Sequence, residues 1–510
     1  MAWSKRSSVE NNVPHLSCRA GAGCGKTSTG IAGLNLMRGK RPDFNGTDQQ
    51  EAIWEAMSQE GAQDIACVAF NKPIAQELQK KVPAGVEAST FHAMCFQAIN
   101  DALGRVKVDN FKADNILENE VDGVSLRKKN PVLFAGTKKL VSLAKATLWD
   151  AEAGSEGLRD IVDHYSIDLN GELPQALDLA PRILSRCLEQ QDVIDFDDMI
   201  WFVHALDLPI RKRDLLLVDE AQDLNRVQQE VALSAGDRLI LIGDPYQSIY
   251  GFRGADSQSM SRMYDILSET DRGVKDLPLM KTFRCPQSHV ELVQKYVPDF
   301  AAYDPTREGI IRSQAGLGTP QDGSLVLCRV NAPLVSAAFR LIKDGVKANI
   351  QGRDIGANLT SLIDKLIDTP QYKMGVGNEV CGLLRALEDY SGKERARIVS
   401  SKFASGSKLV NLEDKVMCIQ VFCAGADSVK NIKGKIKALF QDGSNGRGGV
   451  LLSSIHRAKG LEADSVYILQ PELMPHPMAT VAWEKEQERN CQVVAYTRSK
   501  NELVFIGEPG

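Results

Sequence analysis

A glycine-rich stretch near the start of the chain has the residue types of a phosphate-binding loop. In CRAGAGCGKTSTG, residues 18–30, glycines alternate with other residues immediately before Lys26, Thr27 and Ser28. Glycine lets the backbone curl so that successive N–H groups face an anion, and a helix that begins near Thr27 adds the positive end of its dipole. We therefore predict that Lys26 reaches the terminal phosphates of a nucleotide and that the Thr27 hydroxyl ligates Mg²⁺.

The whole loop is predicted to bind the nucleotide, although its first position holds Ala20 where the pattern normally has glycine. The alternative is an ordinary glycine-rich turn before a helix. Cys24 stands in the loop near Lys26, so we expect backbone N–H groups and the lysine to favour its thiolate. The predicted nucleotide-binding residues of the loop are Ala20, Gly21, Ala22, Gly23, Cys24, Gly25, Lys26, Thr27 and Ser28.

A second candidate lies where a strongly apolar run ends in acidic residues. The segment LLLVDEAQD, 215–223, has the pattern of a buried strand followed directly by Asp219 and Glu220. Phosphoryl transfer needs an acidic group that holds Mg²⁺ and another that orients water. Asp219 is predicted to hold the metal with Thr27, and Glu220 to polarise the attacking water as a general base. A strand that simply ends in a polar loop is the alternative.

The composition is that of an ordinary globular protein. Of the 510 residues, 43% are hydrophobic and 25% charged, and the net charge is only −5, so any nucleic-acid surface must be a local patch. The 11 cysteines form no CxxC pair, which argues against zinc and for reduced thiols in a cytoplasmic protein. The first residues lack the apolar core of a signal peptide, and no run is long enough to span a membrane.

Strand-like apolar runs alternate with helical patterns, which predicts an α/β fold with parallel sheets in two units. Two stretches without strand periodicity interrupt these units and are interpreted as mostly helical insertions. The length also favours several domains. We place the first unit at 1–96 and 191–275 with its insertion at 97–190, and the second unit at 276–360 and 448–510 with its insertion at 361–447.

Several further motifs occur in a fixed order and resemble the UvrD/Rep/PcrA group of superfamily 1A DNA helicases. Two others, FNKPIAQEL (70–78) and TFHAM (90–94), are closer to the branch that contains the F-box DNA helicase. Together they cover both units nearly from end to end. The motifs that carry the resemblance are VDEAQD (218–223), GDPYQSIYGFRGA (243–255), KTFR (281–284), SSIHRAKGLEADSVYIL (453–469) and VAYTRSKNELVF (494–505), with IDFDDMI (194–200) as a further element.

The resemblance implies two RecA-like P-loop domains with ATP between them. It also assigns roles to residues of both units. Arg284 and Arg498 would stabilise charge on the transferring phosphoryl group, and Gln247 would sense the γ-phosphate. Phe283 would stack on adenine. Gly460 and Glu462 would lie at the nucleotide, with Glu462 on the sugar. The alternative for each arginine is a surface salt bridge.

The resemblance also implies a track for single-stranded DNA, which such proteins grip with aromatic side chains and phosphate-binding donors. For any one of the aromatic residues, core packing is the alternative. The lysines of VKNIKGKIKALF, 429–440, could touch duplex phosphates or belong to a solvated face. The residues expected on the track are Asn71, Lys72, Phe91, His92, Tyr250, Phe252, Arg253 and His456.

Together, these features predict an ATP- and Mg²⁺-dependent DNA helicase of replication or repair that moves 3′ to 5′ on single-stranded DNA and acts at single-strand/duplex junctions. The alternative is a DNA-sensing ATPase that regulates a partner such as a nuclease; the chain's end soon after VAYTRSKNELVF leaves no room for a fused one. A small-molecule kinase is disfavoured by the DNA motifs. Relatives carry a glutamine motif before the P-loop, but here the similar TDQQEAI (47–53) follows it, which puts strict ATP preference in doubt.

Overall fold

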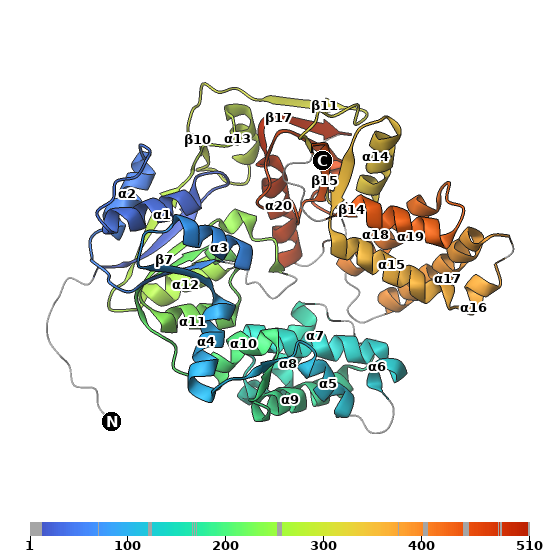
Figure 1. The fold of residues 1–510 in the computed structure, drawn as a ribbon, viewed down its shortest axis with the longest axis horizontal. Helices are drawn as coiled ribbons and strands as arrows, with labels where there is room; N and C mark the ends of the chain where they lie inside the picture. Colours follow the sequence, from blue (N-terminus) through green and yellow to red (C-terminus); the bar gives the residue numbers. More distant parts are fainter. Residues whose placement is uncertain are drawn as a thin grey trace.

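Two parallel sheets and two groups of helices make up the part of the chain that the structure describes (Figure 1). The structure is a computed structural model. In Figure 1 the first sheet lies on the left, the second at the top, and the helical groups below and on the right. The described residues are 13–69, 71–120, 125–165, 167, 169, 171–251, 258–375, 377–400, 406–441, 448–477, 479 and 482–507.

The first sheet has six strands within the described residues, in the order β3-β2-β6-β7-β1-β8, and every pairing is parallel. The middle positions of β2, β6 and β7 are apolar because helices cover both faces, as is usual for parallel sheets. Leu16 of β1 pairs with Ile240 of β7, for example, and both are fully buried. The strands are β1 (His15–Ala20), β2 (Ile65–Ala69), β3 (Val86–Thr90), β6 (Arg213–Asp219), β7 (Gly236–Gly243) and β8 (Val274–Leu279).

Several helices of this unit begin where the sequence supplies a capping side chain. The Thr47 hydroxyl accepts from the backbone N–H of Gln50, whose side chain accepts in return from Thr47, and Asp195 and Asp198 form the same capping box. Such reciprocal caps fix where a helix starts. The helices are α1 (Lys26–Met37), α2 (Asp48–Met57), α3 (Lys72–Lys81), α4 (Phe91–Leu103), α10 (Phe196–Ala205), α11 (Arg226–Ala235) and α12 (Ser259–Ser268).

The first helical group is joined to α10 by buried charges. Lys112 Nζ lies 2.8 Å from Asp198 Oδ2, Lys145 Nζ lies 2.7 Å from Asp198 Oδ1, and these side chains are at most 1% exposed. Two short strands, β4 (Lys107–Val108) and β5 (Val193–Ile194), pair at the base of the group. Its helices are α5 (Lys112–Asn119), α6 (Leu126–Lys129), α7 (Pro131–Thr147), α8 (Gly154–His164) and α9 (Leu173–Glu189).

The second sheet has seven strands among the residues described, in the order β11-β17-β16-β12-β15-β13-β14, again all parallel. Its strands are β11 (Ile310–Gln314), β12 (Leu325–Cys328), β13 (Ala348–Gln351), β14 (Phe440–Gln441), β15 (Val450–Ser454), β16 (Ala463–Leu469) and β17 (Ser499–Ile506). Helices α13 (Gln287–Val293), α14 (Ala332–Lys343) and α20 (Ala482–Tyr496) accompany the sheet, and β9 (Lys281–Thr282) pairs with β10 (Ala301–Ala302) beside it.

The second helical group shares one apolar core with this sheet. Val326 and Ile350 of the sheet belong to the same buried cluster as Ile363, Leu383 and Ile432 of the helices. The group therefore packs as an extension of the second unit. Its helices are α15 (Arg353–Ile367), α16 (Pro370–Lys373), α17 (Glu379–Ser400), α18 (Gly406–Cys423) and α19 (Val429–Leu439).

These sheets confirm the predicted α/β class with parallel strands. The four-part division stays a prediction, but three of its limits fall inside regular elements. Strand β8 pairs with β1 up to Leu279, so the first sheet continues beyond 275; its VKDLPL sequence is only partly apolar and gave no strand signal. Helix α4 crosses the limit at 96/97, and α15 crosses the limit at 360/361.

No helix of the described ranges is both long and apolar enough to cross a membrane.

The buried charges around Asp198 give a stability prediction. Asp198→Asn keeps the volume but leaves the Lys112 and Lys145 ammonium groups with too little negative charge in a dry site. Breaking a buried pair in this way costs about 3–5 kcal/mol. We expect a loss of that size in the free energy of unfolding, measured by urea denaturation. Asp160→Asn, at an exposed position of α8, is the matched control. Equal stability of the two variants would contradict the structural role of Asp198.

Candidate active site

The glycine-rich loop joins β1 to α1 and has a backbone that favours glycine at two positions. Gly23 and Gly25 have φ values of 70° and 77°, in the left-handed region. A Cβ atom at Gly23 would lie 2.5 Å from Cβ of Arg284, so the loop and the segment after β8 approach as closely as the backbone allows. Gly25 is the N-cap of α1, which places the start of the helix directly beneath the loop.

Thr27 and Asp219 lie together although 192 positions separate them. The Thr27 hydroxyl donates to Asp219 Oδ2 at 2.7 Å, across the ends of α1 and β6. A hydroxyl and a buried carboxylate are hard oxygen ligands of the kind that Mg²⁺ prefers, usually together with phosphate oxygens. The residues present therefore fit the predicted metal ion.

The charges at this end of the sheet are strongly coupled. Burial alone would lower the pKa of Lys26, but the carboxylates of Glu220, Asp244 and Asp219 raise it above its ordinary value. Burial and then the charge of Glu220 raise the pKa of Asp219, whereas for Glu220 the effect of burial is outweighed by Lys26 and Lys459, which lower its pKa. Glu220 is therefore the stronger acid of the pair and remains ionised, as a base must.

Glu220 is held in an unusual backbone conformation. Its φ of 56° lies in the left-handed region, which is costly for a residue with a side chain and is most often kept at functional sites. Gln222 Nε2 donates to Glu220 Oε2 at 2.5 Å, and Gln222 Oε1 accepts from the backbone N–H of Asp244 at 2.8 Å. Gln222 thus links Glu220 to the end of β7. The sequence analysis did not single out Gln222, although it stands in the VDEAQD motif.

Gln247 lies where the two units meet. Its Nε2 donates to Asp244 Oδ2 at 2.5 Å, and its Oε1 accepts from Arg498 Nη2 at 3.0 Å. Arg498, from the second unit, is 1% exposed, and its pKa is lowered to about 9 by burial and by the neighbouring Arg284. The two units are therefore connected through a side chain that the resemblance assigns to phosphate sensing.

Lys459 makes another polar contact between the units. Its Nζ lies 2.5 Å from Asp223 Oδ2 and donates to the Gln247 carbonyl at 2.9 Å. Burial raises the pKa of Asp223 to about 6. Sequence reasoning used Lys459 only to locate Gly460 and Glu462, because nothing in the local pattern shows a partner 236 positions away.

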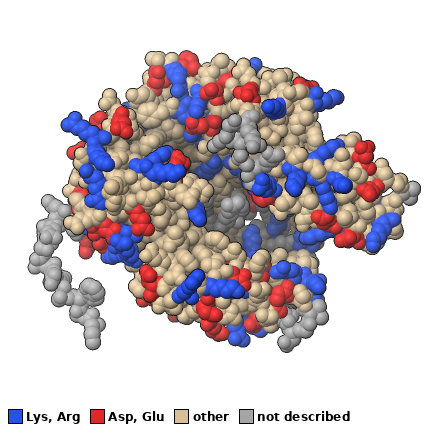
Figure 2. Space-filling model, viewed as in Figure 1, with Lys and Arg blue, Asp and Glu red and all other residues tan. Residues whose placement is uncertain are grey.

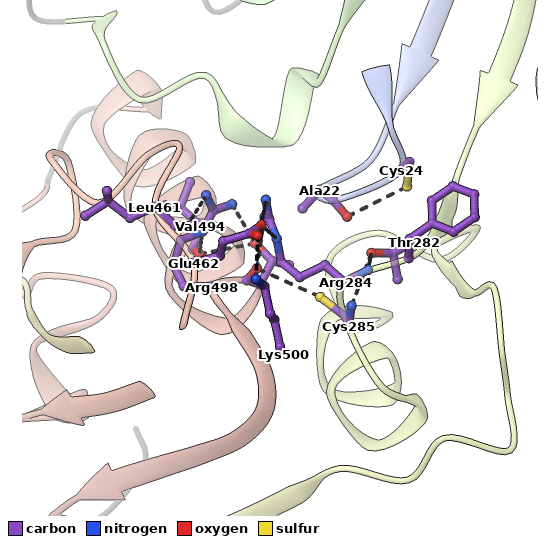
Figure 3. A network of polar contacts seen from close by, with 12 residues as sticks. Ala22, Cys24, Thr282, Arg284, Cys285, Leu461, Glu462, Val494, Arg498 and Lys500 are labelled. Carbon is purple, nitrogen blue, oxygen red and sulfur yellow. Dashed lines mark hydrogen bonds and ion pairs between the residues drawn. The ribbon is translucent and has the colours of Figure 1, made fainter. Parts of the chain in front are cut away.

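Arg284 lies at the other side of the cleft and turns toward Glu462 (Figure 3). Its Nη2 is 2.7 Å from Glu462 Oε2, its Nη1 donates to the Thr497 carbonyl at 3.2 Å, and Lys500 Nζ is 2.7 Å from Glu462 Oε1. Two cations thus share the carboxylate that the resemblance places on the nucleotide sugar. Lys500 is an additional site residue that the sequence analysis did not identify.

A cavity of about 420 Å³ opens between these groups. Most of the predicted nucleotide residues border it, together with Arg307 and Lys500. The predicted nucleotide-site residues that do not line it are Ala20, Gly21, Ala22, Asp219, Gln247, Gly460 and Arg498. Its lining consists of Gly23, Cys24, Gly25, Lys26, Thr27, Ser28, Glu220, Phe283, Arg284, Arg307, Glu462 and Lys500.

Phe283 is the aromatic residue of this cavity. It is 39% exposed and lies against Tyr303, with ring centroids 4.6 Å apart. A planar ring at the rim of a phosphate-binding cavity is suited to stacking with a nucleobase. Tyr303, which is 54% exposed, extends this aromatic surface and was not predicted.

The expectation that Cys24 forms a thiolate is wrong. The side chain is fully buried, its Sγ faces the Ala22 carbonyl at 3.7 Å, and burial raises the thiol pKa far above its ordinary value. Asp244 adds to this effect, and Lys26 offsets it only in part. Sequence proximity to Lys26 was misleading because the thiol points into the apolar layer beneath the loop.

The predicted DNA residues lie in several places. Asn71 and Lys72 are exposed at the start of α3, where Asn71 Oδ1 accepts from the Ile74 N–H. Tyr250 and His456 lie together, since the Tyr250 hydroxyl donates to the His456 carbonyl at 3.2 Å. His92, on α4, is half-buried with its ring edge toward Phe196, and burial lowers its pKa. Phe252 and Arg253 lie outside the described residues.

The prediction that Phe91 contacts DNA is wrong. Its ring is 3% exposed and belongs to the apolar core on one face of the first sheet, with Met94 and Cys95. Phe91 is the first residue of α4, and its side chain points inward. The alternative of core packing applies here, because a ring enclosed by apolar neighbours cannot stack on a base.

Comparisons with known proteins place the chain in a family. The family model described as the UvrD/REP helicase N-terminal domain matches residues 3–267, and that of the UvrD-like helicase C-terminal domain matches residues 402–508. Similar proteins include F-box DNA helicase 1 of Gallus gallus, 21% identical over 91% of this chain and 46% of the relative, and F-box DNA helicase protein 1 of Schizosaccharomyces pombe, 22% identical over 91% and 54%.

A third relative, the ATP-dependent DNA helicase PcrA of Staphylococcus aureus, is 26% identical over 39% of this chain and 29% of its own length. The chain thus spans about half the length of the F-box relatives and less of PcrA.

The burial of Cys24 predicts its reactivity. A brief treatment with iodoacetamide near neutral pH should modify Cys381, which is exposed, and leave Cys24 almost unmodified, because a buried neutral thiol is a poor nucleophile. Peptide mass spectrometry of the intact and the Cys381→Ser proteins would measure both rates. Modification of Cys24 as fast as Cys381 would show that its thiol is accessible and ionised.

Proposed function

Because this chain belongs to the UvrD/REP helicase family, we propose that it is an ATP-driven translocase on single-stranded DNA that separates strands in the 3′ to 5′ direction. The single observation that carries the proposal is the contact set of Gln247. Its side chain joins Asp244 of the first unit to Arg498 of the second, and its carbonyl accepts from Lys459. A change at the phosphates would therefore act on both units at once.

In this proposal ATP binds in the cavity between the loop after β1 and the segment that carries Phe283 and Arg284. Lys26 binds the terminal phosphates, and Thr27 and Asp219 would hold Mg²⁺. The metal ion, when bound, supplies charge neutralisation at the phosphates. Glu220, ionised and positioned by Gln222, accepts a proton from the attacking water.

The cations of the second unit complete the site. Arg284 and Lys500 are held by Glu462 beside the cavity, so a nucleotide would compete with that carboxylate for them. Arg498 would move from its contact with Gln247 toward the γ-phosphate and stabilise the charge of the transition state. Release of that charge after hydrolysis would reopen the cleft, which is the usual basis of a stepping motor.

A path to DNA begins at Gln247. Tyr250 follows three positions later and contacts the His456 carbonyl, while the Lys459 ammonium lies 5.1 Å from the centre of the Tyr250 ring. Asn71, Lys72, His92 and His456 are proposed to contact the strand, with Tyr250 nearby. Closure of the cleft would thus change the contacts of Tyr250 with the second unit.

The proposal is tested with the protein alone. ATPase activity measured with and without single-stranded DNA should rise when DNA is added, and a duplex with a 3′ tail, but not one with a 5′ tail, should be unwound. Stimulation without unwinding would favour the DNA-sensing ATPase that regulates a partner. An ATPase indifferent to DNA would contradict both functions.

Removal of a cation from the first unit and removal of one from the second unit should affect different steps of the reaction. Lys26→Ala is expected to abolish nucleotide binding, whereas Arg498→Ala should keep binding and lower DNA-stimulated turnover by about 10³-fold or more. Equilibrium binding of a fluorescent ATP analogue and steady-state ATPase assays would separate these effects. Arg489→Ala, at an exposed position of α20, is the control. A normal turnover rate in Arg498→Ala would remove this residue from the reaction.

The lysines of α19 are proposed to contact duplex DNA ahead of the junction. Lys433 is already paired with Asp364, and Lys435 donates to the Gly425 carbonyl, so the exposed Lys430 and Lys437 are the ones able to bind phosphates. Reversal of both to Glu should weaken unwinding of tailed duplexes severalfold and reduce its salt dependence, while ATPase stimulated by single strands is kept.

The double reversal Lys128→Glu and Lys129→Glu changes the net charge equally and serves as the control for the α19 lysines. If unwinding and single-strand-stimulated ATPase both fall in the α19 variant, these lysines are needed for translocation or for folding. If neither changes, α19 presents only a solvated face.

A further inference from the structure

We infer that Trp483, together with Lys139, forms a binding subsite for single-stranded nucleic acid in the central cavity of the molecule; this inference rests on the proposed function. The cavity has a volume of about 340 Å³ and is bordered by three parts of the chain. Lys139 and Tyr165 come from the first helical group, His456 and Trp483 from the second unit, and Asn411 from α18. Figure 2 shows a hollow near the middle of one face with Lys and Arg side chains around it.

Three aromatic rings follow one another at one side of the cavity, and the outer two, Trp483 and Tyr165, line it. Trp483 is stacked on His164, with centroids 5.8 Å apart and planes inclined by 26°, and His164 contacts Tyr165 edge-on at 4.7 Å. The Trp483 indole N–H donates to the His164 carbonyl at 3.0 Å, which fixes the orientation of the ring. A fixed row of aromatic rings beside a cavity is what nucleobases stack on, and such stacking tolerates any base.

The cavity wall carries three cationic and three acidic side chains, and which of them are already engaged decides what charge is left for a ligand. The cavity has three acidic residues in its wall, but the two oxygens of Glu488 are taken by Arg329 at 2.6–3.0 Å, and Asp414 accepts from Asn331 and from two backbone N–H groups. Glu484 is 5% exposed. Lys139 is exposed, and no carboxylate of the described chain lies within 4 Å of its ammonium. Its charge is therefore available to a phosphate.

The position of Trp483 links this wall to the proposed DNA path. A Cβ atom at Gly251 would lie 3.4 Å from Trp483 Cε3, so the indole packs directly on the residue after Tyr250. On the other side, Tyr250 holds the His456 carbonyl, and His456 also borders the cavity. A strand leaving the Tyr250 region would therefore meet the Trp483 ring next.

The test is direct binding of oligo(dT) to the full chain. Trp483→Ala should weaken binding by about 5- to 150-fold, the effect expected when a stacked base loses its platform. Lys139→Ala should weaken binding and lower the slope of log affinity against log salt by about 1. Fluorescence anisotropy of labelled oligo(dT) over a range of salt concentrations measures both. Lys129→Ala, in the same helical group but outside the cavity, is the control.

Intrinsic fluorescence gives an independent readout. The chain has five tryptophans, and oligo(dT) should quench the emission of the intact protein but not, or much less, that of Trp483→Phe. A matched Trp149→Phe variant should keep the quenching.

Different failures are distinguishable. If the intact protein does not bind oligo(dT), the proposed function fails. If it binds while the Trp483 and Lys139 variants bind equally well, with unchanged salt slope and quenching, the subsite is wrong. Thermal destabilisation of Trp483→Ala with unchanged affinity would show that the Trp483–His164 stack only holds the parts together. Weaker binding of blunt duplex alone would assign the cavity to duplex DNA and overturn the inference.

Discussion

The two sheets are held together by a shared apolar cluster and by a few buried polar contacts around Gln247. Arg498 and Lys459 reach from the second unit to Gln247 and Asp223 of the first, and Arg498 and Asp223 are almost fully buried. A buried cation costs free energy unless it is paired, and burial, followed by the charge of Arg284, lowers the pKa of Arg498 to about 9. The junction therefore holds a charge that is only partly compensated. A phosphate arriving beside Lys26 would supply the missing anion, so nucleotide binding and the position of the units are linked through electrostatics.

The cations at the mouth of the cavity are also only partly compensated. Arg284 and Lys500 share the single carboxylate of Glu462, and the charge and hydrogen bonds of these cations lower its pKa against the opposing effect of burial. The pairing keeps both cations ordered without neutralising them completely. Within the first unit, by contrast, the coupled carboxylates of Asp219 and Glu220 surround Lys26. The cleft thus separates an acidic wall, suited to a metal ion and a base, from a cationic wall, suited to phosphates.

Much of this site could be predicted because its parts are short and local. The loop at Lys26 and the acidic strand end at Asp219 are each specified within about ten residues, and their contact follows from the parallel sheet, whose carboxyl ends lie at one edge. The errors arose at residues whose role depends on the direction in which the side chain points. Cys24 and Phe91 sit in the right segments, but both point into the core. Contacts between distant positions, such as Lys459 with Asp223 or Trp483 with His164, have no local signal at all, and β8 was missed because an edge strand is only partly apolar.

The apolar cores explain how motion in the cleft would reach DNA. One cluster joins a face of the first sheet to the first helical group, and another joins a face of the second sheet to α15–α19. A third runs from the other face of the first sheet, at Leu16 and Ile240, to Leu325 and Val466 of the second. Each helical group is therefore tied to its own sheet by a shared core, and any rotation of one sheet against the other must rearrange contacts of the third cluster. The central cavity is bordered by both groups and by the second unit, so any rotation of the sheets about the junction changes its width. A DNA strand bound in this cavity would therefore be gripped or released by the rotation itself, with no additional moving element.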